Sequence, residues 1–448
     1  MSLTQQPGPA ALPQLEQQVA DILQEAKRQG ATACEVAVSA QQGLSIGVRQ
    51  REVESVEFTR DQGFSISLYA GQRKGNASTS MTGADAIRET VAAALAIAKH
   101  TSPDDCAGLG EPEQMATELP DLDLWHPWDI SPQQAIELAL QCEEAAFAAD
   151  ARISMGDGTS LDTDRGCTVY GNSLGFIGGY AGTRHSLSCV MIAGQGENMQ
   201  RSYWYDYGRD ARLLDSAQSI GATAAARTTA RLGARKVATC QVPVIFSAEV
   251  AGSLLGHLLG AISGSALYRK SSFLLDAMGE QLFPQWLSVD ERPQLRGGLA
   301  SSAFDGDGLA THDKHIVKDG QLCSYLLSLY SGRKLGLPST ANAGGARNVF
   351  VSHGDLDQAS LIKQMDRGLL VTELMGQGVN MVTGDYSRGA GGYWVENGQI
   401  QFPVQEVTIA GNLRDLYRNL VAIGNDVDRR GGIRTGSILL EQMTVAGD

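Results

Sequence analysis

One stretch of the chain, residues 247–276, has the residue order on which hydrolytic sites are often built. A β-branched run, 242–246, predicts a strand, and the Leu-, Ala- and Gly-rich residues after it predict a helix that follows a short turn. Such a helix start offers free backbone N–H groups and a fixed platform for side chains. A Glu in the first turn, here Glu249, commonly complements the helix dipole, which needs no catalysis. The platform is therefore present, and a structural role for Glu249 is favoured.

Three further motifs could carry nucleophilic or metal chemistry, and each has a simpler interpretation. Residues 171–175 fit the Gly-x-Ser-x-Gly elbow, but strand-like residues follow where the elbow needs a helix, so a turn is predicted. Residues 331–334 match Ser-x-x-Lys without its companion motifs, which indicates a loop. His312 and His315 are the only close histidine pair, and residues three apart on a strand point to opposite faces. His257, in the predicted helix, is interpreted as a core or interface residue.

A glycine-rich segment, residues 372–398, is the best candidate for a substrate groove. Glycine lets another backbone approach closely, and exposed aromatic side chains with an arginine can anchor an extended peptide along a sheet edge. Hairpin turns with packed aromatic side chains explain the same residues equally well. A nucleotide site is disfavoured, because neither a complete dinucleotide fingerprint nor Gly-Lys-Ser/Thr occurs. The groove candidates are Glu373, Asp385, Tyr386, Arg388, Tyr393 and Trp394.

The elements around these segments predict an α+β fold. Helical periodicity begins after Pro13 and ends at Gly30, and four short strands separated by glycine-containing turns should fill residues 34–80. A second helix is predicted over 84–100. Residues 101–127 collect Pro, Asp, Glu and Gly without periodicity and indicate an exposed linker.

The second half of the chain repeats helix and strand signals and then becomes strand-rich. Ser131 and Pro132 form a helix start, strands should follow over 154–199, and a long helix is predicted over 210–232. The later hairpin signals are Asp319-Gly320 and Asn397-Gly398, and the later short helices are 357–367 and 412–419. We therefore expect two N-terminal helix/antiparallel-sheet units and then a mainly antiparallel, barrel-like β domain. The expected parts are a domain at 1–100, a linker at 101–127, a domain at 128–235 and a domain at 240–448.

Composition limits the classes of function. The 448 residues carry a formal charge of −14, which disfavours nucleic acid and anionic lipid as partners. Seven cysteines without a C-x-x-C pair indicate reduced thiols in a cytoplasmic protein. The first residues have no signal-peptide pattern, and the apolar stretch 251–267 is shorter than the ~20 residues of a membrane span. We expect that stretch to be a buried helix.

The residues after about Val242 resemble the TldD/PmbA metalloprotease family, whereas the N-terminal half matches it only in layout. The likeness is carried by Tyr268–Asp276, Thr372–Gly378, Gly384–Gly389, Tyr393–Gly398 and Ile409–Asn412.

The resemblance carries an expectation about zinc. In the family's active subunit a helix carries His-Glu-x-x-x-His, which binds zinc, and those three positions fall here on Ala248, Glu249 and Ser253. The family's third ligand, a Cys near the C-terminus, falls on Thr435. The resemblance therefore implies the PmbA (TldE) type of subunit, with Glu249 as a remnant of the motif. No cofactor is expected in this chain, and zinc is expected only in a TldD-type partner.

Three hypotheses follow. The first is the non-zinc subunit of a cytoplasmic TldD/PmbA heterodimer that hydrolyses unfolded or small peptides inside a chamber, this chain being inactive alone. The resemblance favours it. The second is a non-enzymatic peptide-binding or regulatory homodimer, in keeping with the family's older label as a modulator of DNA gyrase. The third is an independent hydrolase with a metal site built from His312, His315 and nearby acids.

Overall fold

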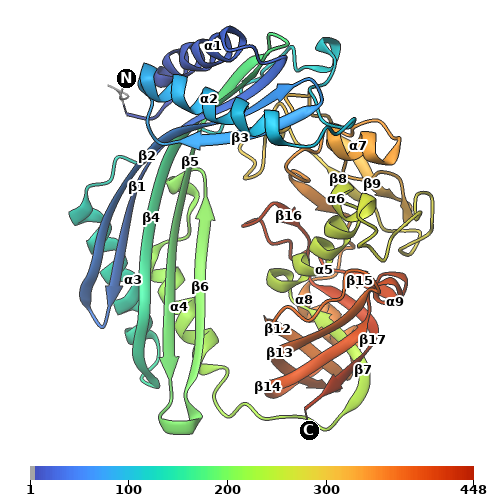
Figure 1. Cartoon of the computed structure of the whole chain (residues 1–448). Helices are drawn as coiled ribbons and strands as arrows, with labels where there is room; N and C mark the ends of the chain where they lie inside the picture. Colours follow the sequence, from blue (N-terminus) through green and yellow to red (C-terminus); the bar gives the residue numbers. More distant parts are fainter. Residues whose placement is uncertain (1–5, 448) are drawn as a thin grey trace.

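The computed structural model describes residues 6–447; residues 1–5 of the expected N-terminal domain and residue 448 of the expected C-terminal domain lie outside the described part. The fold is α+β, as predicted, with two helix/antiparallel-sheet regions followed by a β-barrel. Figure 1 shows the long strands of the N-terminal sheet standing beside the C-terminal region, which contains the barrel.

One antiparallel sheet spans both N-terminal regions, in the order β3-β2-β1-β4-β5-β6. β1 pairs with β2 on one side and with β4 on the other, so the two predicted units share a single sheet, a feature that the sequence patterns did not predict. The strands are β1 (Ala33–Arg49), β2 (Glu52–Ala70), β3 (Arg73–Thr79), β4 (Ile153–Asn172), β5 (Ile177–Ala193) and β6 (Gln200–Gly208).

The prediction of four short strands before residue 80 was wrong, because β1 and β2 each run without a break through a glycine. A Cβ on Gly43 would lie 2.3 Å from an Asp164 carboxylate oxygen, and one on Gly63 would lie 2.6 Å from the Thr79 carbonyl oxygen. These glycines therefore serve close packing between neighbouring strands, and neither forms a turn.

The real turn between β1 and β2 contains no glycine. Gln50 and Arg51 have φ values of 54° and 63°, which are uncommon for residues with a side chain. Their backbone N–H groups donate to the two carboxylate oxygens of the buried Glu143, at 3.0 and 2.6 Å. A side chain from another element thus stabilises this conformation.

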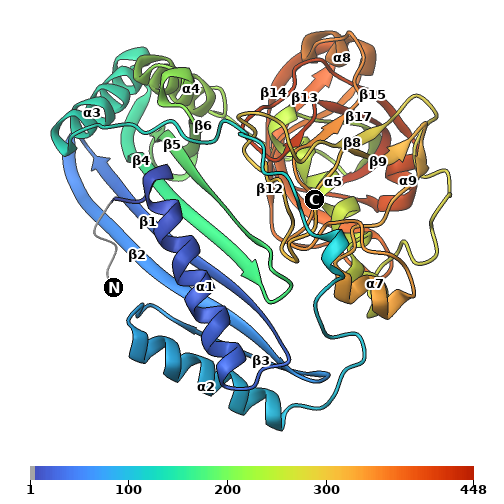
Figure 2. The same ribbon diagram turned by 90° about the horizontal axis from the view of Figure 1, so that it is seen from above.

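Four helices cover one face of the N-terminal sheet. Even-numbered residues of β1 are buried along its length, and because strand residues alternate between faces, both buried clusters lie on the same face. The helices are α1 (Leu12–Arg28) and α2 (Ala84–His100) over one half, and α3 (Pro132–Ala149) and α4 (Ala217–Thr229) over the other (Figure 2). The opposite face carries small polar residues: Ser45 donates to Asp162 at 2.5 Å, and the hydroxyls of Ser160 and Ser188 lie 2.9 Å apart.

Helix α4 is shorter than predicted. The expected helix over 210–232 is broken into a 3₁₀ turn, Ala211–Leu213, and α4 itself. Ser216 begins α4, because its side chain accepts a hydrogen bond from the backbone N–H of Ser219.

Five strands close the C-terminal barrel in the order β14-β13-β12-β7-β17, with β17 returning to β14. The barrel is mainly antiparallel, as predicted, with one parallel pair, β7 with β12. Its strands are β7 (Cys240–Phe246), β12 (Gly368–Met375), β13 (Asp385–Glu396), β14 (Gln399–Asn412) and β17 (Ile438–Ala446), and β15 (Leu420–Ile423) extends it beside β17.

A second, smaller sheet has the order β10-β9-β8-β11-β16, and helix α5 (Ala248–Ala261) packs its apolar face between this sheet and the barrel. The strands are β8 (Val289–Glu291), β9 (Lys314–Lys318), β10 (Gln321–Leu322), β11 (Val349–Val351) and β16 (Ile433–Arg434). The short helices are α6 (Gly264–Tyr268), α7 (Leu329–Leu335), α8 (Gln358–Met365) and α9 (Leu413–Arg418).

Both predicted hairpin turns are confirmed. Asp319 and Gly320 (φ 50° and 79°) join β9 to β10, and Asn397 and Gly398 (φ 54° and 66°) join β13 to β14. Helices α8 and α9 lie within the predicted ranges. The interpretation of 331–334 as a loop was wrong, because these residues lie in α7, which Ser328 caps.

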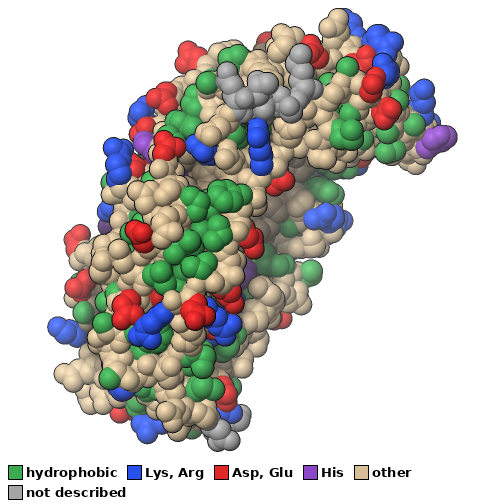
Figure 3. Space-filling model, turned by 90° about the vertical axis from the view of Figure 1, so that its left-hand side faces the viewer, with side chains coloured by type: hydrophobic (Ala, Val, Ile, Leu, Met, Phe, Trp, Pro, Cys, Tyr) green, Lys and Arg blue, Asp and Glu red, His purple; other side chains and the backbone are tan. Residues whose placement is uncertain are grey.

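Residues 101–127 are mostly irregular, as expected for a linker, but they are not uniformly exposed. Met115, Leu122 and Leu124 are buried in a cluster with Phe176 and Phe304, so this segment packs between the N-terminal sheet and the C-terminal region. Among the helices of the described residues, none combines the length and hydropathy needed to cross a membrane. On the face drawn in Figure 3, the described basic and acidic side chains are interspersed.

Candidate functional site

The junction of β7 and α5 is fixed by hydrogen bonds to the backbone of β12 and to the side chain of Ser437, directly before β17. The Ser247 N–H donates to the Val371 carbonyl of β12 at 2.9 Å, and the Ala248 N–H donates to the Ser437 hydroxyl at 3.1 Å. Ser437 in turn donates to Asp426 at 2.6 Å. Strand, turn and helix therefore occur as predicted, and the first turn of α5 is held in place.

The positions that the family resemblance assigned to zinc ligands do not fit a zinc ion. Ala248 has no ligating atom, the Ser253 hydroxyl donates to the Val250 carbonyl at 2.6 Å, and the buried Thr435 hydroxyl donates to the Gly436 carbonyl at 3.2 Å. Zinc sites in proteins use thiolate, imidazole and carboxylate ligands. Within residues 6–447 no group of three or more such side chains could hold a metal ion. No chemical step of this chain is therefore assigned to a resident zinc.

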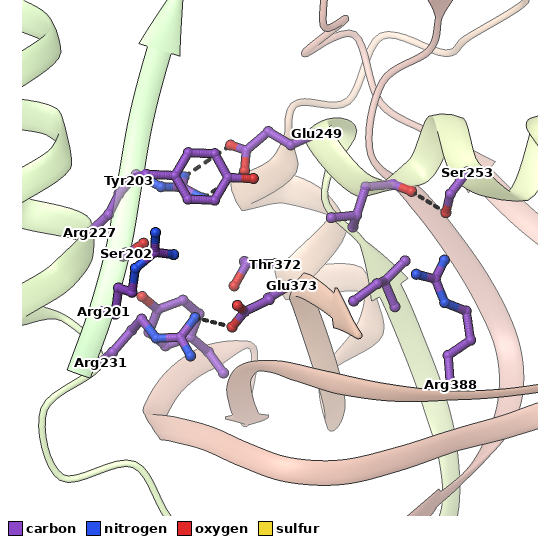
Figure 4. A pocket seen from close by; sticks show the side chains of 13 residues that line it. Arg201, Ser202, Tyr203, Arg227, Arg231, Glu249, Ser253, Thr372, Glu373 and Arg388 are labelled. Carbon is purple, nitrogen blue, oxygen red and sulfur yellow. Dashed lines mark hydrogen bonds and ion pairs between the residues drawn. The ribbon is translucent and has the colours of Figure 1, made fainter. Parts of the chain in front are cut away.

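A cavity of about 420 Å³ lies beside the first turns of α5, where β6 and α4 approach the barrel (Figure 4). It includes Glu249 and Ser253 from the predicted helix, and it joins parts of the chain that are far apart in sequence. Its lining residues are Arg201, Ser202, Tyr203, Arg227, Arg231, Glu249, Val250, Ser253, Thr372, Glu373, Leu374, Arg388 and Tyr393.

Two ion pairs form what we call the paired side of the pocket: Arg227 with Glu249, and Arg231 with Glu373. Arg227 donates to both carboxylate oxygens of Glu249 at 3.0 and 2.7 Å, and Arg231 contacts Glu373 directly. Both arginines belong to the α4 region, whereas the glutamates belong to α5 and β12. The paired side therefore holds the N-terminal region against the C-terminal region, and the Glu249 carboxylate is occupied by that contact.

Arg388 differs from the other arginines that line the pocket. Arg201 contacts Asp157 at 2.6 Å, but no ion pair joins Arg388 to a carboxylate in the described part of the chain. The Nε atom of Arg388 is buried and has no hydrogen-bond partner there. Figure 4 shows its guanidinium reaching from β13 towards α5, opposite the paired side. The positive charge of Arg388 is thus not neutralised by an adjacent acid.

Two more polar side chains lie near Arg388 but outside the pocket lining, and with it they form what we call the unpaired side: His257, Tyr386 and Arg388. The His257 and Tyr386 rings meet edge to face with centroids 5.9 Å apart, and His257 Nε2 has no hydrogen-bond partner in the described chain. The Tyr386 hydroxyl makes no hydrogen bond of ordinary geometry, but it lies close enough to the Arg388 guanidinium to interact with it. Burial lowers the pKa of His257, and the charge of Arg388 lowers it further. Burial raises the pKa of Tyr386 to about 12, against the opposing effect of Arg388. Both groups are therefore neutral near pH 7.

The predicted groove residues divide into two sets. Glu373, Arg388 and Tyr393 line the pocket. Tyr386 and Trp394 are only 1% and 5% exposed and pack in the core of the C-terminal region, where Trp394 donates to Glu396 at 3.0 Å. Asp385 is exposed outside the pocket and accepts hydrogen bonds from Thr383 at 2.6 Å and from Asn412 at 3.2 Å.

Sequence reasoning missed the part of the pocket that comes from the N-terminal region. Arg201 and Tyr203 project from β6, and Arg227 and Arg231 come from α4 and the turn after it. Arg227 and Arg231 are four residues apart, and in the helix predicted over 210–232 this spacing places them on one side. The spacing was therefore a signal that the two arginines could act together. Nothing in the spacing predicted which acids would face them.

The remaining motifs have structural roles. Gly171 and Asn172 end β4, and residues 173–175 lie in the predicted turn before β5, with φ of 99° at Gly175. His315 of β9 contacts Asp290 at 2.6 Å, whereas His312 precedes that strand, and the two do not belong to a metal-binding group among the described residues.

Most of the chain matches known proteins. Models of the PmbA/TldA metallopeptidase family match as domain 1 over residues 34–98, as the central domain over 125–232 and as the C-terminal domain over 239–447. The chain is 51% identical to metalloprotease PmbA of Escherichia coli O157:H7, over 92% of each sequence. It is 49% identical to a metalloprotease PmbA homolog of Haemophilus influenzae, over 97% of this chain and 96% of that one.

Solved structures give the same result for the fold. A putative modulator of DNA gyrase from Bacteroides thetaiotaomicron superposes with a TM-score of 0.93 at 27% identity, covering 98% of this chain and 100% of that one. TldE from Thermococcus kodakarensis has the same fold, with a TM-score of 0.84 at 20% identity, covering 96% of this chain and 100% of that one. From the family models and the identity to its relatives, the chain belongs to the PmbA/TldA metallopeptidase family.

Proposed function

We propose that this chain is the non-zinc, PmbA (TldE) type subunit of a heterodimeric TldD/PmbA metalloprotease that hydrolyses unfolded or small peptides. In this proposal a TldD-type partner holds zinc and activates water. This chain supplies interface, chamber wall and part of the peptide groove, at the pocket where residues 128–235 meet residues 240–448. Because all seven cysteines are free, a reducing cytoplasm suits it.

The observation that carries the proposal is the set of side chains at the start of α5. A chain of a metallopeptidase family presents a methyl group at Ala248 and hydroxyls at Ser253 and Thr435 that already donate to carbonyl oxygens. The carboxylate of Glu249 is occupied by Arg227. These side chains can shape a wall but offer no set of zinc ligands, which supports the proposal that activity depends on another subunit.

The described residues also offer a place for an extended peptide. β6 is the last strand of its sheet and pairs among the described strands only with β5, so its outer edge can form backbone hydrogen bonds, except at the Tyr205 carbonyl, which accepts from Arg430 at 2.9 Å. Three residues of β6, 201–203, line the pocket. A peptide bound along this edge would be recognised mainly through its backbone, which suits substrates of varied sequence.

The test is reconstitution of activity with purified proteins. The chain alone should hydrolyse no unstructured peptide and contain no stoichiometric zinc by elemental analysis, while an equimolar mixture with a TldD-type subunit should hydrolyse the peptide. The TldD-type subunit alone is the matched control. Robust hydrolysis by this chain alone would contradict the proposal. Peptide binding without cleavage, even in the mixture, would instead support a regulatory homodimer.

A further inference from the structure

A second cavity, of about 490 Å³, lies where the open face of the N-terminal sheet meets the C-terminal region. Arg184 of β5 lines it from the sheet face that no helix covers, opposite to the buried Ala181. Arg209, directly after β6, also lines it, as do Arg347 and residues 299–302 of the C-terminal region. We call this cavity the arginine pocket, and it shares no lining residue with the pocket beside α5.

Four arginines line the arginine pocket, and three of them have no acidic partner in the described chain. Arg165 contacts Asp129 at 3.4 Å, but no ion pair within residues 6–447 joins Arg184, Arg209 or Arg347 to a carboxylate. Burial lowers the pKa of Arg209, and the charge of Arg184 lowers it further, so these two guanidinium groups repel each other. In a chain whose 50 acidic residues outnumber its 36 basic ones, such a cavity needs an explanation.

Two acids lie near these arginines without forming an ion pair in the described chain. Asp164 lines the pocket, and burial, followed by the charge of Asp162, raises its pKa. The buried Asp305 lies near Arg347, but its carboxylate accepts backbone N–H groups at 2.9 to 3.0 Å. Positive charge therefore remains in excess even when both acids are ionised.

The three arginines are held in place and still have hydrogen-bond donors available. Arg347 donates to two backbone carbonyl oxygens at 3.1 and 3.2 Å. Arg209 donates at 2.9 to 3.3 Å to three, those of Thr183, Gly298 and Leu299. Because a guanidinium has five N–H donors, two remain on Arg209 and three on Arg347. The exposed Arg184 makes no hydrogen bond within the described chain.

A carboxylate is the ligand that this chemistry favours in a peptide. Guanidinium groups hold carboxylates through paired, charge-assisted hydrogen bonds, which are about twice as strong as neutral ones. Partial burial strengthens such a contact, because the effective dielectric constant is lower than in water. A bound anion would also offset the repulsion between Arg184 and Arg209.

We propose that Arg184, Arg209 and Arg347 bind carboxylates of the peptide substrate in the arginine pocket. The carboxylates come from acidic side chains or from the C-terminus of the peptide. This inference rests on the proposed function for the identity of the ligand, but the binding site lies wholly within this chain. It gives the open face of the sheet a preference for acidic segments of a substrate.

Binding of three N-terminally labelled peptides to the full chain tests the site by fluorescence anisotropy at low salt. The probes are a Gly/Ser/Ala octapeptide amide with two central glutamates, the same amide with two glutamines, and the glutamine peptide with a free C-terminus. At least one carboxylate peptide should bind about tenfold more tightly than the glutamine amide, the value of one charge-assisted contact. Preference for the glutamate amide assigns the site to side chains, and preference for the free acid assigns it to the C-terminus. Equal binding of all three peptides overturns the inference.

Substitutions of Arg184 locate the binding and separate it from a structural role. Arg184→Gln should reduce the preference to about a third, Arg184→Lys should keep most of it, and Arg184→Glu should abolish it. The midpoint of urea unfolding should stay the same in Arg184→Gln, because this exposed side chain makes no hydrogen bond within the described chain. Arg28→Gln, on an exposed part of α1, is the matched control and should bind like the wild type. If Arg184→Glu retains the preference, or if Arg184→Gln is less stable than the control, the inference fails.

The outcome is separable from that of the proposed function. If the mixture with a TldD-type subunit hydrolyses peptides but all three probes bind alike, the carboxylate site is refuted and the subunit assignment stands. If the carboxylate probes bind selectively but no mixture is active, the carboxylate site stands and the subunit assignment is refuted.

Discussion

On the paired side of the pocket each guanidinium contacts a carboxylate, whereas on the unpaired side the guanidinium of Arg388 contacts none. Both sides are partly withdrawn from water, and both use arginines that reach towards α5 or the strands beside it. The two sides differ in whether the positive charge of the arginine is neutralised by an adjacent carboxylate. Arg227 and Arg231 join the N-terminal region to the C-terminal region, whereas Arg388 forms no ion pair with an acid within the described chain.

This contrast separates charged groups that are neutralised within the fold from one that has no adjacent acid. An ion pair with both partners present offsets part of its desolvation cost, and removal of one partner leaves a charge uncompensated. A group that already lacks a partner contributes little to stability, so its removal costs little or even stabilises. The two sides should therefore respond to substitution with opposite sign.

The largest effect is expected from loss of both acids of the paired side. The double variant Glu249→Gln, Glu373→Gln leaves Arg227 and Arg231 without counter-charges at sites that are 28% and 19% exposed. We expect the free energy of unfolding to fall by about 2–4 kcal/mol, measured by urea denaturation. The control is Glu406→Gln, whose carboxylate lies 3.6 Å from Lys236 on the exposed surface. A double variant no less stable than this control would show that the ion pairs do not hold the two regions together.

A smaller effect of opposite sign is expected from Arg388→Met. Methionine keeps most of the side-chain length and removes a charge that has no acidic partner. The free energy of unfolding should stay the same or rise by up to about 1 kcal/mol, measured under the same conditions as the previous variant. A loss of more than about 1 kcal/mol would show that Arg388 has a stabilising role, and the two sides of the pocket would then not differ in the proposed way.

Sequence patterns predicted correctly the elements whose start or end depends on contacts between residues close together in the chain. Helix α3 begins at Pro132, because Ser131 caps it with side-chain contacts within the same turn. The long β1 strand was missed, because its continuity through Gly43 depends on Asp164, which is more than a hundred residues away in the chain. The turn at Gln50 was missed for the same reason, since its N–H group is satisfied by Glu143 of α3.

The candidate site was predictable only in part. The strand-helix junction could be inferred from residue types alone, whereas the expectation of missing zinc ligands came from the family resemblance, and the role of the segment that contains Arg388 stays a prediction. Burial was not predictable, because aromatic residues of the core and of the surface look alike in the sequence, so the buried Tyr386 and Trp394 could not be told from residues that line the pocket. The contribution of Arg227 depends on how α4 packs against α5, which no local pattern encodes.

The smallest effect is a pH dependence of stability to which His257 of the unpaired side should contribute. Burial, and then the charge of Arg388, lowers the pKa of His257 in the folded chain below its ordinary value of 6.5. As the pH falls through that value, the unfolded chain takes up the proton first, so stability present above pH 6.5 is lost on acidification. The free energy of unfolding of His257→Asn, measured by urea denaturation, should fall less between pH 7 and pH 5.5 than that of the wild type. Arg388→Met should also lose less, because this variant removes the second cause of the lowered His257 pKa. His100→Asn, at the exposed end of α2, should behave as wild type; an identical loss in all four proteins would place the acid sensitivity outside the unpaired side.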